Sequence, residues 1–104
     1  MASDTQLHKI KEILENHIGK ENQISSGEIG PEIGIYEDAT HVQVRNLIRE
    51  AIEKLRLPIG GGNRGYYLIK DRNELRQYTA SIENRISEMQ RRKDLIEEAF
   101  DDYY

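Results

Sequence analysis

Residues 57–69 read LPIGGGNRGYYLI, with a short β-prone run on each side of a glycine-rich segment. Residues 57–59 and 66–69 include β-branched and aromatic side chains, which are enriched in strands. Residues 60–65 tolerate the positive φ angles that tight hairpin turns require. This stretch therefore predicts a β-hairpin with a flexible, glycine-rich loop at its tip.

The segment just before the hairpin predicts the strongest helix of the chain. Its apolar residues recur at three- and four-residue steps, as in an amphipathic helix, and we expect Thr40 to cap its N-terminus. The apolar side consists of Val44, Leu47, Ile48, Ala51, Ile52 and Leu55. The opposite side carries Gln43, Arg45, Asn46 and Arg49. No acidic residue occurs from Ala39 to Arg49, although the 104 residues have a formal net charge of −4.

Two shorter helices are expected nearer the N-terminus. The first is predicted from an apolar stripe that precedes Gly19, a typical helix stop. This stripe consists of Leu7, Ile10, Ile13, Leu14 and Ile18. The second helix begins after Ser25 and ends at Gly34, and Pro31 inside it predicts that it is short or kinked. The residues around Ile24 can add a short third strand to the hairpin.

Residues 71–104 contain neither glycine nor proline and predict one long helix. Their apolar residues follow three- and four-residue steps if Lys93 occupies one position, and the step from Ile82 to Ile86 departs from heptad order like a stutter. Thirty helical residues span roughly 45 Å, whereas the 70 residues before them should have a radius of gyration of ~11 Å. The distal part of this helix therefore needs a partner.

Pairing with a second copy of the chain is the simplest way to cover that helix. The predicted dimerisation residues are Leu75, Tyr78, Ile82, Ile86, Met89, Ile96 and Phe100. The alternative is a helix that folds back onto its own domain and buries only the first three of them. A homodimer is favoured because the distal apolar residues would otherwise face water.

The order of three helices followed by a hairpin carries a family resemblance. Residues 24–35 resemble the first half of a helix-turn-helix, and residues 44–50 resemble its recognition helix. Residues 57–68 look like the wing of the biotin-operon-repressor type of winged helix-turn-helix DNA-binding domain. The chain departs from that pattern in Gly30 and Pro31 and in a longer segment between the second and third helices.

The resemblance implies a mainly α fold with a small β-hairpin wing. Residues 1–70 would form the winged helix-turn-helix domain, and residues 71–104 would form a long C-terminal helix with an acidic end. A winged helix followed by a single long helix is similar to small regulators of phages and bacteria. The implied function is sequence-specific binding of double-stranded DNA by a homodimer that regulates transcription in the cytoplasm.

The resemblance also implies which residues contact DNA, because the third helix of this family lies in the major groove. Arginine pairs with guanine there, and asparagine and glutamine pair with adenine, so Gln43, Arg45, Asn46 and Arg49 are the expected base readers. Thr40, Arg64 and Lys70 are the expected contacts to phosphates or the minor groove. The alternative interpretation of these residues is an ordinary solvated surface.

The charge balance keeps a second function open. Residues 1–70 contain nine basic and ten acidic residues, and residues 71–104 contain six basic and nine acidic ones. The acidic excess thus falls mainly on the C-terminal helix, and the expected DNA-binding domain is nearly neutral. The alternative function is a protein–protein interaction module that uses the winged helix and the acidic C-terminal helix.

Other classes of function find little support in the sequence. Without cysteine the chain has no disulfide, thiolate zinc site or cysteine nucleophile. The spacing Gly60-x-Gly62-x-x-Gly65 resembles a dinucleotide-binding loop, but a strand follows it where that motif needs a helix. We expect no enzymatic activity, no cofactor and no metal. The first residues lack the features of a signal peptide, and no apolar run approaches the ~20 residues of a membrane span, which favours a cytoplasmic protein.

Overall fold

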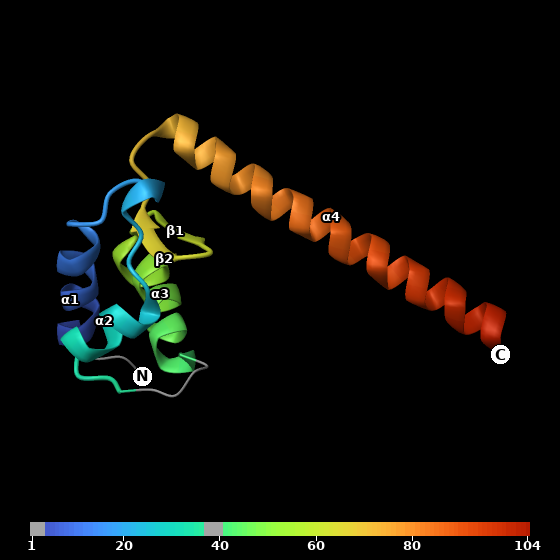
Figure 1. The fold of residues 1–104 in the computed structure, drawn as a ribbon, viewed down its shortest axis with the longest axis horizontal. Helices are drawn as coiled ribbons and strands as arrows, with labels where there is room; N and C mark the ends of the chain where they lie inside the picture. Colours follow the sequence, from blue (N-terminus) through green and yellow to red (C-terminus); the bar gives the residue numbers. More distant parts are fainter. Residues whose placement is uncertain (1–3, 37–40) are drawn as a thin grey trace. The chain divides into compact units, whose positions relative to one another are not determined.

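The computed structural model describes residues 4–36 and 41–104, and the chain forms two compact units, Met1–Asp71 and Arg72–Tyr104. The fold is mainly helical, with a two-stranded antiparallel hairpin and a long C-terminal helix (Figure 1), which confirms the predicted fold class. In the part of the chain that the structure describes, no helix is long and apolar enough to cross a membrane.

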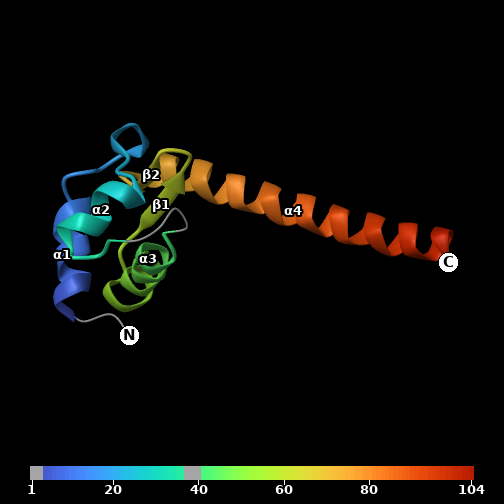
Figure 2. The same cartoon turned by 60° about the horizontal axis from the view of Figure 1, so that its bottom comes forward.

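The first unit contains three α-helices, one turn of 3₁₀ helix and the hairpin. In chain order these are α1 (Asp4–Leu14), η1 (Lys20–Asn22), α2 (Ser26–Glu32), α3 (Val42–Leu55), β1 (Ile59–Gly62) and β2 (Gly65–Leu68). Helix α3 packs against α1 and α2, and Figure 2 shows all three helices beside the hairpin.

Helix α1 is shorter than its apolar stripe predicts. It ends at Leu14 because the following residues leave the helix to pair with β2. The amide of Gly19 donates to the carbonyl of Leu68 at 2.8 Å, and the amide of Leu68 donates to the carbonyl of His17 at 3.0 Å. The prediction that Ile18 continues the stripe of this helix was wrong, because Ile18 lies beyond the end of α1 in a parallel bridge with Leu68 and is 47% exposed.

The first strand of the hairpin is longer than predicted, and the loop is shorter. Strand β1 includes Gly60–Gly62, which the sequence had placed in the loop, so that only Asn63 and Arg64 form the turn. Gly60 pairs with Tyr67, and a Cβ atom at Gly60 would lie 2.6 Å from the ring of that buried tyrosine. The glycine is needed there for close packing within the sheet and not for a flexible loop.

The other edge of β2 pairs with the residues around Ile24, as the sequence predicts. The amides of Ile24 and Tyr66 each donate to the other residue's carbonyl at 2.8 Å. Gly65 starts β2 with a φ of 141°, and a side chain there would collide with the carbonyl oxygen of Ile24. The hairpin is thus fixed to the segment between α1 and α2.

Helix α2 is short, as the sequence predicts, and its N-terminus is capped by Ser25. The Ser25 hydroxyl oxygen accepts from the amide of Glu28 at 3.2 Å, and the Glu28 carboxylate accepts from the amide of Ser25 at 3.4 Å. Pro31 lies in the last turn, and Gly34 follows with a φ of 78°. The capping residues therefore determine where this helix begins, and Gly34 allows the chain to turn away after it.

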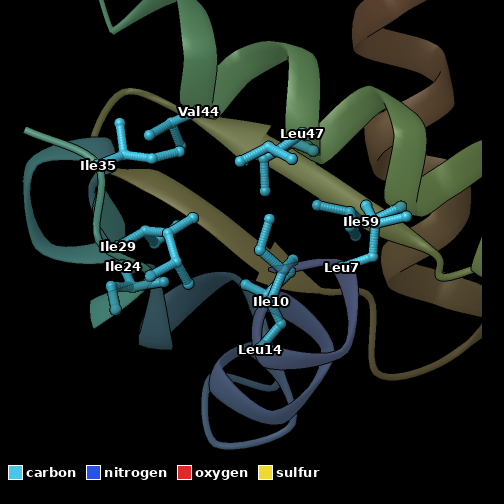
Figure 3. Close-up of a cluster of buried hydrophobic side chains, with 12 residues drawn as sticks. Leu7, Ile10, Leu14, Ile24, Ile29, Ile35, Val44, Leu47 and Ile59 are labelled. Atoms are coloured by element: carbon cyan, nitrogen blue, oxygen red, sulfur yellow. The ribbon is translucent and has the colours of Figure 1, made fainter. Parts of the chain in front are cut away.

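One apolar core joins the elements of the first unit. In Figure 3, Val44 and Leu47 of α3 lie across from Ile10 and Leu14 of α1, with residues of α2 and β1 at the sides. The buried core residues are Leu7, Ile10, Leu14, Ile24, Ile29, Ile33, Ile35, Val44, Leu47, Ile48, Ala51 and Ile59. Ile52, which the sequence places on the apolar side of α3, is not part of this core. It lies about 80° around the helix from Val44, at the edge of the stripe, and is 41% exposed.

The second unit is the helix α4 (Arg72–Tyr103), which runs for 32 residues without interruption, as predicted. Among its predicted dimerisation residues, Leu75, Tyr78 and Ile82 are half-buried. The distal ones are exposed to solvent: Ile86, Met89, Ile96 and Phe100.

Candidate nucleic-acid interface

The exposed side of α3 carries all four residues that the sequence predicts as base readers. Burial of Val44, Leu47 and Ile48 turns the opposite side of the helix toward solvent, and Gln43, Arg45, Asn46 and Arg49 are exposed there. This side therefore presents donors and acceptors of the kinds that recognise base edges.

These four side chains do not form one cluster. At about 100° per residue, Arg45 and Arg49 lie about 40° apart around the axis, and Asn46 lies about 60° beyond Arg49. Gln43 lies about 160° from Arg45, on the other flank of the exposed side. The helix thus brings Arg45, Asn46 and Arg49 together, and Gln43 adjoins only Asn46.

Val42 belongs to the same surface, although sequence reasoning did not select it. It is 44% exposed and lies between Arg49 and Asn46 on the helix circumference. An apolar side chain in a major groove can contact the methyl group of thymine. The sequence carried a usable signal, because Val42 precedes the buried stripe by two residues and falls outside its spacing.

The N-terminus of α3 differs from the expectation. His41 occupies the N-cap position in the left-handed conformation, with a φ of 52°, and its side chain makes no capping hydrogen bond. Its half-buried ring lies beside α2, where a Cβ atom at Gly27 would be 3.9 Å from the ring carbon Cε1. Thr40, predicted as the cap and as a phosphate contact, lies outside the described residues.

The tip of the hairpin presents Arg64, and its backbone is fixed by a side chain from far away in the sequence. The amide of Arg64 donates to Oε1 of Gln23 at 3.0 Å, and Nε2 of Gln23 donates to the carbonyl of Lys20 at 3.0 Å. A Cβ atom at Gly62 would lie 2.7 Å from the same Oε1 atom. Gln23 therefore holds the tip against η1 and leaves the exposed side chain of Arg64 in solvent.

Gln23 is a positioning residue that sequence reasoning missed. It lies in a short polar connection with no repeating pattern, and its partner is 41 residues away. The cluster of glycines at residues 60–62 is the only related signal in the sequence, since close approach of another segment is one reason for glycine in a strand.

Lys70 already has an acidic partner. Its Nζ atom lies 3.4 Å from Oε1 of Glu21, and both side chains are largely exposed. The pKa of the Glu21 carboxyl lies below its ordinary value. The larger cause is a hydrogen bond from the backbone of Glu21 to its own carboxylate, and the second is the nearby positive charge of Lys70. A phosphate group that binds Lys70 must therefore compete with this carboxylate.

No protein-family model, curated protein or solved structure matches this chain. Its function must be inferred from the chemistry of the exposed residues on α3 and the hairpin.

Proposed function

We propose that this protein binds double-stranded DNA in a sequence-specific manner through a winged helix-turn-helix domain and regulates transcription as a homodimer. The observation that carries the proposal is the exposed side of α3. It combines Arg45, Asn46 and Arg49 on one surface, with Gln43 on its flank, and the helix has no acidic residue before Glu50. These are the residue types that pair with guanine and adenine in the major groove.

The hairpin supplies the second contact. Arg64 lies exposed at a tip whose backbone is tied to Gln23, so that its guanidinium group can reach the minor groove or a phosphate. Lys70 adds a phosphate contact by exchanging Glu21 for the DNA backbone. Such contacts position the protein, and α3 supplies the specificity.

Homodimerisation compensates for weak electrostatic attraction. Residues 1–70 have nine basic and ten acidic residues, so a single domain attracts the phosphate backbone only through its local basic side chains. Two linked domains bind two half-sites of one duplex, and the second binding event becomes intramolecular. The assignment to transcription, and to a cytoplasmic phage or bacterial regulator, rests on analogy with winged helix domains.

A protein-binding role is the second candidate, and exposed apolar side chains favour it. Val42 and Ile52 of α3 are 44% and 41% exposed, and Tyr36 is 82% exposed. Apolar and aromatic residues of this kind are enriched in protein–protein interfaces. In that case the same side of α3 would contact a protein instead of a DNA groove.

Selection from a pool of random duplex DNA at two salt concentrations separates the two candidates. DNA binding predicts an enriched motif with two related half-sites and an affinity that falls steeply with salt. A folded, dimeric protein that enriches no motif at either salt concentration would contradict the DNA proposal and support the protein-binding role.

A further inference from the structure

The distal half of α4 exposes a continuous apolar line. Its five apolar side chains are between 59% and 80% exposed, which is unusual for residues of this size in an isolated soluble chain. Together with one lysine they recur at steps of three and four residues and so share one face of the helix. We call this line the distal seam; it consists of Ile86, Met89, Lys93, Ile96, Phe100 and Tyr103.

The distal seam is symmetric along the helix. Its successive steps are three, four, three, four and three residues, so the pattern is the same in both directions about a point between Asp94 and Leu95. In a second copy that runs the opposite way about this point, Ile86 meets Tyr103, Met89 meets Phe100 and Lys93 meets Ile96. Each of these pairs then lies at one height along the two helices.

The charges around the distal seam are divided between its two halves. Residues 85–93 contain four basic residues and one acidic residue, a net charge of +3. Residues 96–104 contain four acidic residues and no basic one, a net charge of −4. A second copy in the opposite direction places each basic half beside the partner's acidic half, whereas a parallel copy places like charges side by side.

We propose that two copies of this chain pair through the distal seam in antiparallel orientation, with the symmetry axis between Asp94 and Leu95. This inference builds on the homodimer of the proposed function and specifies its interface and direction. The charge division also selects the register. If the helices shift by one heptad, residues 85–93 lie beside residues 89–97, which have three basic and two acidic residues, and the complementarity is lost.

Lys93 gives a second reason for the antiparallel direction. In a parallel pair this lysine would face its own copy across the apolar seam, where like charges repel. In the antiparallel pair it lies beside the partner's Ile96, and its Nζ atom can keep its 2.9 Å contact with Glu97 of the same helix. Its aliphatic stem can then cover apolar surface while the ammonium group stays in water.

The two directions predict very different distances between the starts of α4. In the antiparallel pair each Arg72 lies about 34 Å along the helix from the symmetry axis, so the two helix starts are about 68 Å apart. In a parallel pair the same residues would lie side by side, about 10 Å apart.

Disulfide cross-linking tests the direction, because the natural chain has no cysteine. The variants are Met89→Cys and Phe100→Cys, each made alone with a different affinity tag, then unfolded together, refolded and oxidised. We expect no covalent dimer in either single variant and a covalent heterodimer in the mixture. The control pair is Ser87→Cys with Asp102→Cys, which lies at matching heights but on the outer side of the helix and should not cross-link.

A spin label on Arg76→Cys provides a second measurement that leaves the distal seam unchanged. The antiparallel pair predicts a label separation of about 55 Å along the axis, and a parallel pair predicts about 10 Å before the length of the labels is added. Self-linking of each single seam variant, or a short label distance, would overturn the antiparallel arrangement. A protein that is monomeric by sedimentation and forms no seam cross-link would overturn the dimer as well.

These experiments distinguish a failure of the antiparallel dimer from a failure of the proposed DNA binding. If the mixed cross-link and the long distance are found but the DNA selection enriches nothing, the antiparallel dimer stands and only DNA binding is refuted.

Discussion

Helices α3 and α4 carry similar apolar patterns, yet one pattern is buried and the other is exposed. In α3 the residues Val44, Leu47 and Ile48 are no more than 5% exposed, because α1 and α2 pack over them. In α4 the residues of the distal seam have the same three- and four-residue spacing and remain in solvent. A periodic apolar pattern therefore identifies a helix and its apolar face. Whether that face is buried in the core or stays exposed and available to another molecule depends on the rest of the chain.

Truncating an apolar side chain to alanine should lower the stability of the fold much more in α3 than in the distal seam of α4, and this is the largest difference that we expect. Leu47→Ala creates a cavity in the core and should lower the free energy of unfolding by about 2–5 kcal/mol. Ile96→Ala should leave the unfolding of the first unit nearly unchanged, since that side chain is 59% exposed. Urea denaturation, followed by tyrosine fluorescence at concentrations that keep the chain monomeric, checks both. Equal decreases in the free energy of unfolding for both variants would contradict the difference between a buried and an exposed face.

A charged residue in the distal seam should weaken the dimer and leave the folding of the first unit unchanged. Met89→Asp places a carboxylate where the partner's Phe100 packs, beside the partner's acidic residues, and should weaken the dimer by about 3 kcal/mol, roughly 100-fold. Sedimentation equilibrium measures the dissociation constant. Ser87→Asp adds the same charge on the outer side of α4 and serves as the matched control. Identical masses for both variants and the natural chain would contradict the seam.

The polar side of α3 should contribute to binding and not to stability. Arg49→Ala should weaken binding to the selected duplex by about 1–3 kcal/mol and leave the unfolding midpoint unchanged, because the side chain is exposed. Lys9→Ala removes one exposed positive charge from α1 and is the control for the change in net charge. Equal losses of affinity would show that only net charge matters.

Removing the ion pair between Lys70 and Glu21 should have the smallest effect on stability. Since the pKa of Glu21 is below its ordinary value of 4.5, its contribution to stability is present above that pH and is lost as the pH falls through the folded-state pKa. The natural chain should lose slightly more stability than Glu21→Gln below pH 4.5, and less so at high salt. Parallel pH profiles of the two proteins would exclude this contribution.

Features that depend on neighbouring residues could be predicted from the sequence. The cap of α2 was predictable because Ser25 and Glu28 satisfy each other's backbone amides within one turn. The buried stripe of α3 and the uninterrupted α4 follow from periodicity and from the absence of glycine and proline. The composition of the exposed side of α3 follows from the same periodicity, because a buried stripe determines which residues lie opposite.

Features that depend on distant residues could not be predicted. Ile18 continues the α1 stripe in the sequence, but the helix ends before it because its neighbours His17 and Gly19 form hydrogen bonds with Leu68. The glycines of β1 suggested a loop, but the ring of Tyr67 fills the space beside Gly60, and the side chain of Gln23 fills the space beside Gly62. Gln23 had no local signal at all for its contact with the hairpin tip. In each case the deciding partner lies on another element.

The proposed DNA binding requires individual side chains on the exposed side of α3 to read individual bases. The most direct measurement repeats the selection from random duplex DNA with Arg49→Ala and with Lys9→Ala, beside the natural chain. We expect Arg49→Ala to lose its preference at one symmetric base-pair position and to keep the rest of the motif, while Lys9→Ala enriches the unchanged motif. An identical motif for all three proteins would contradict base reading by Arg49.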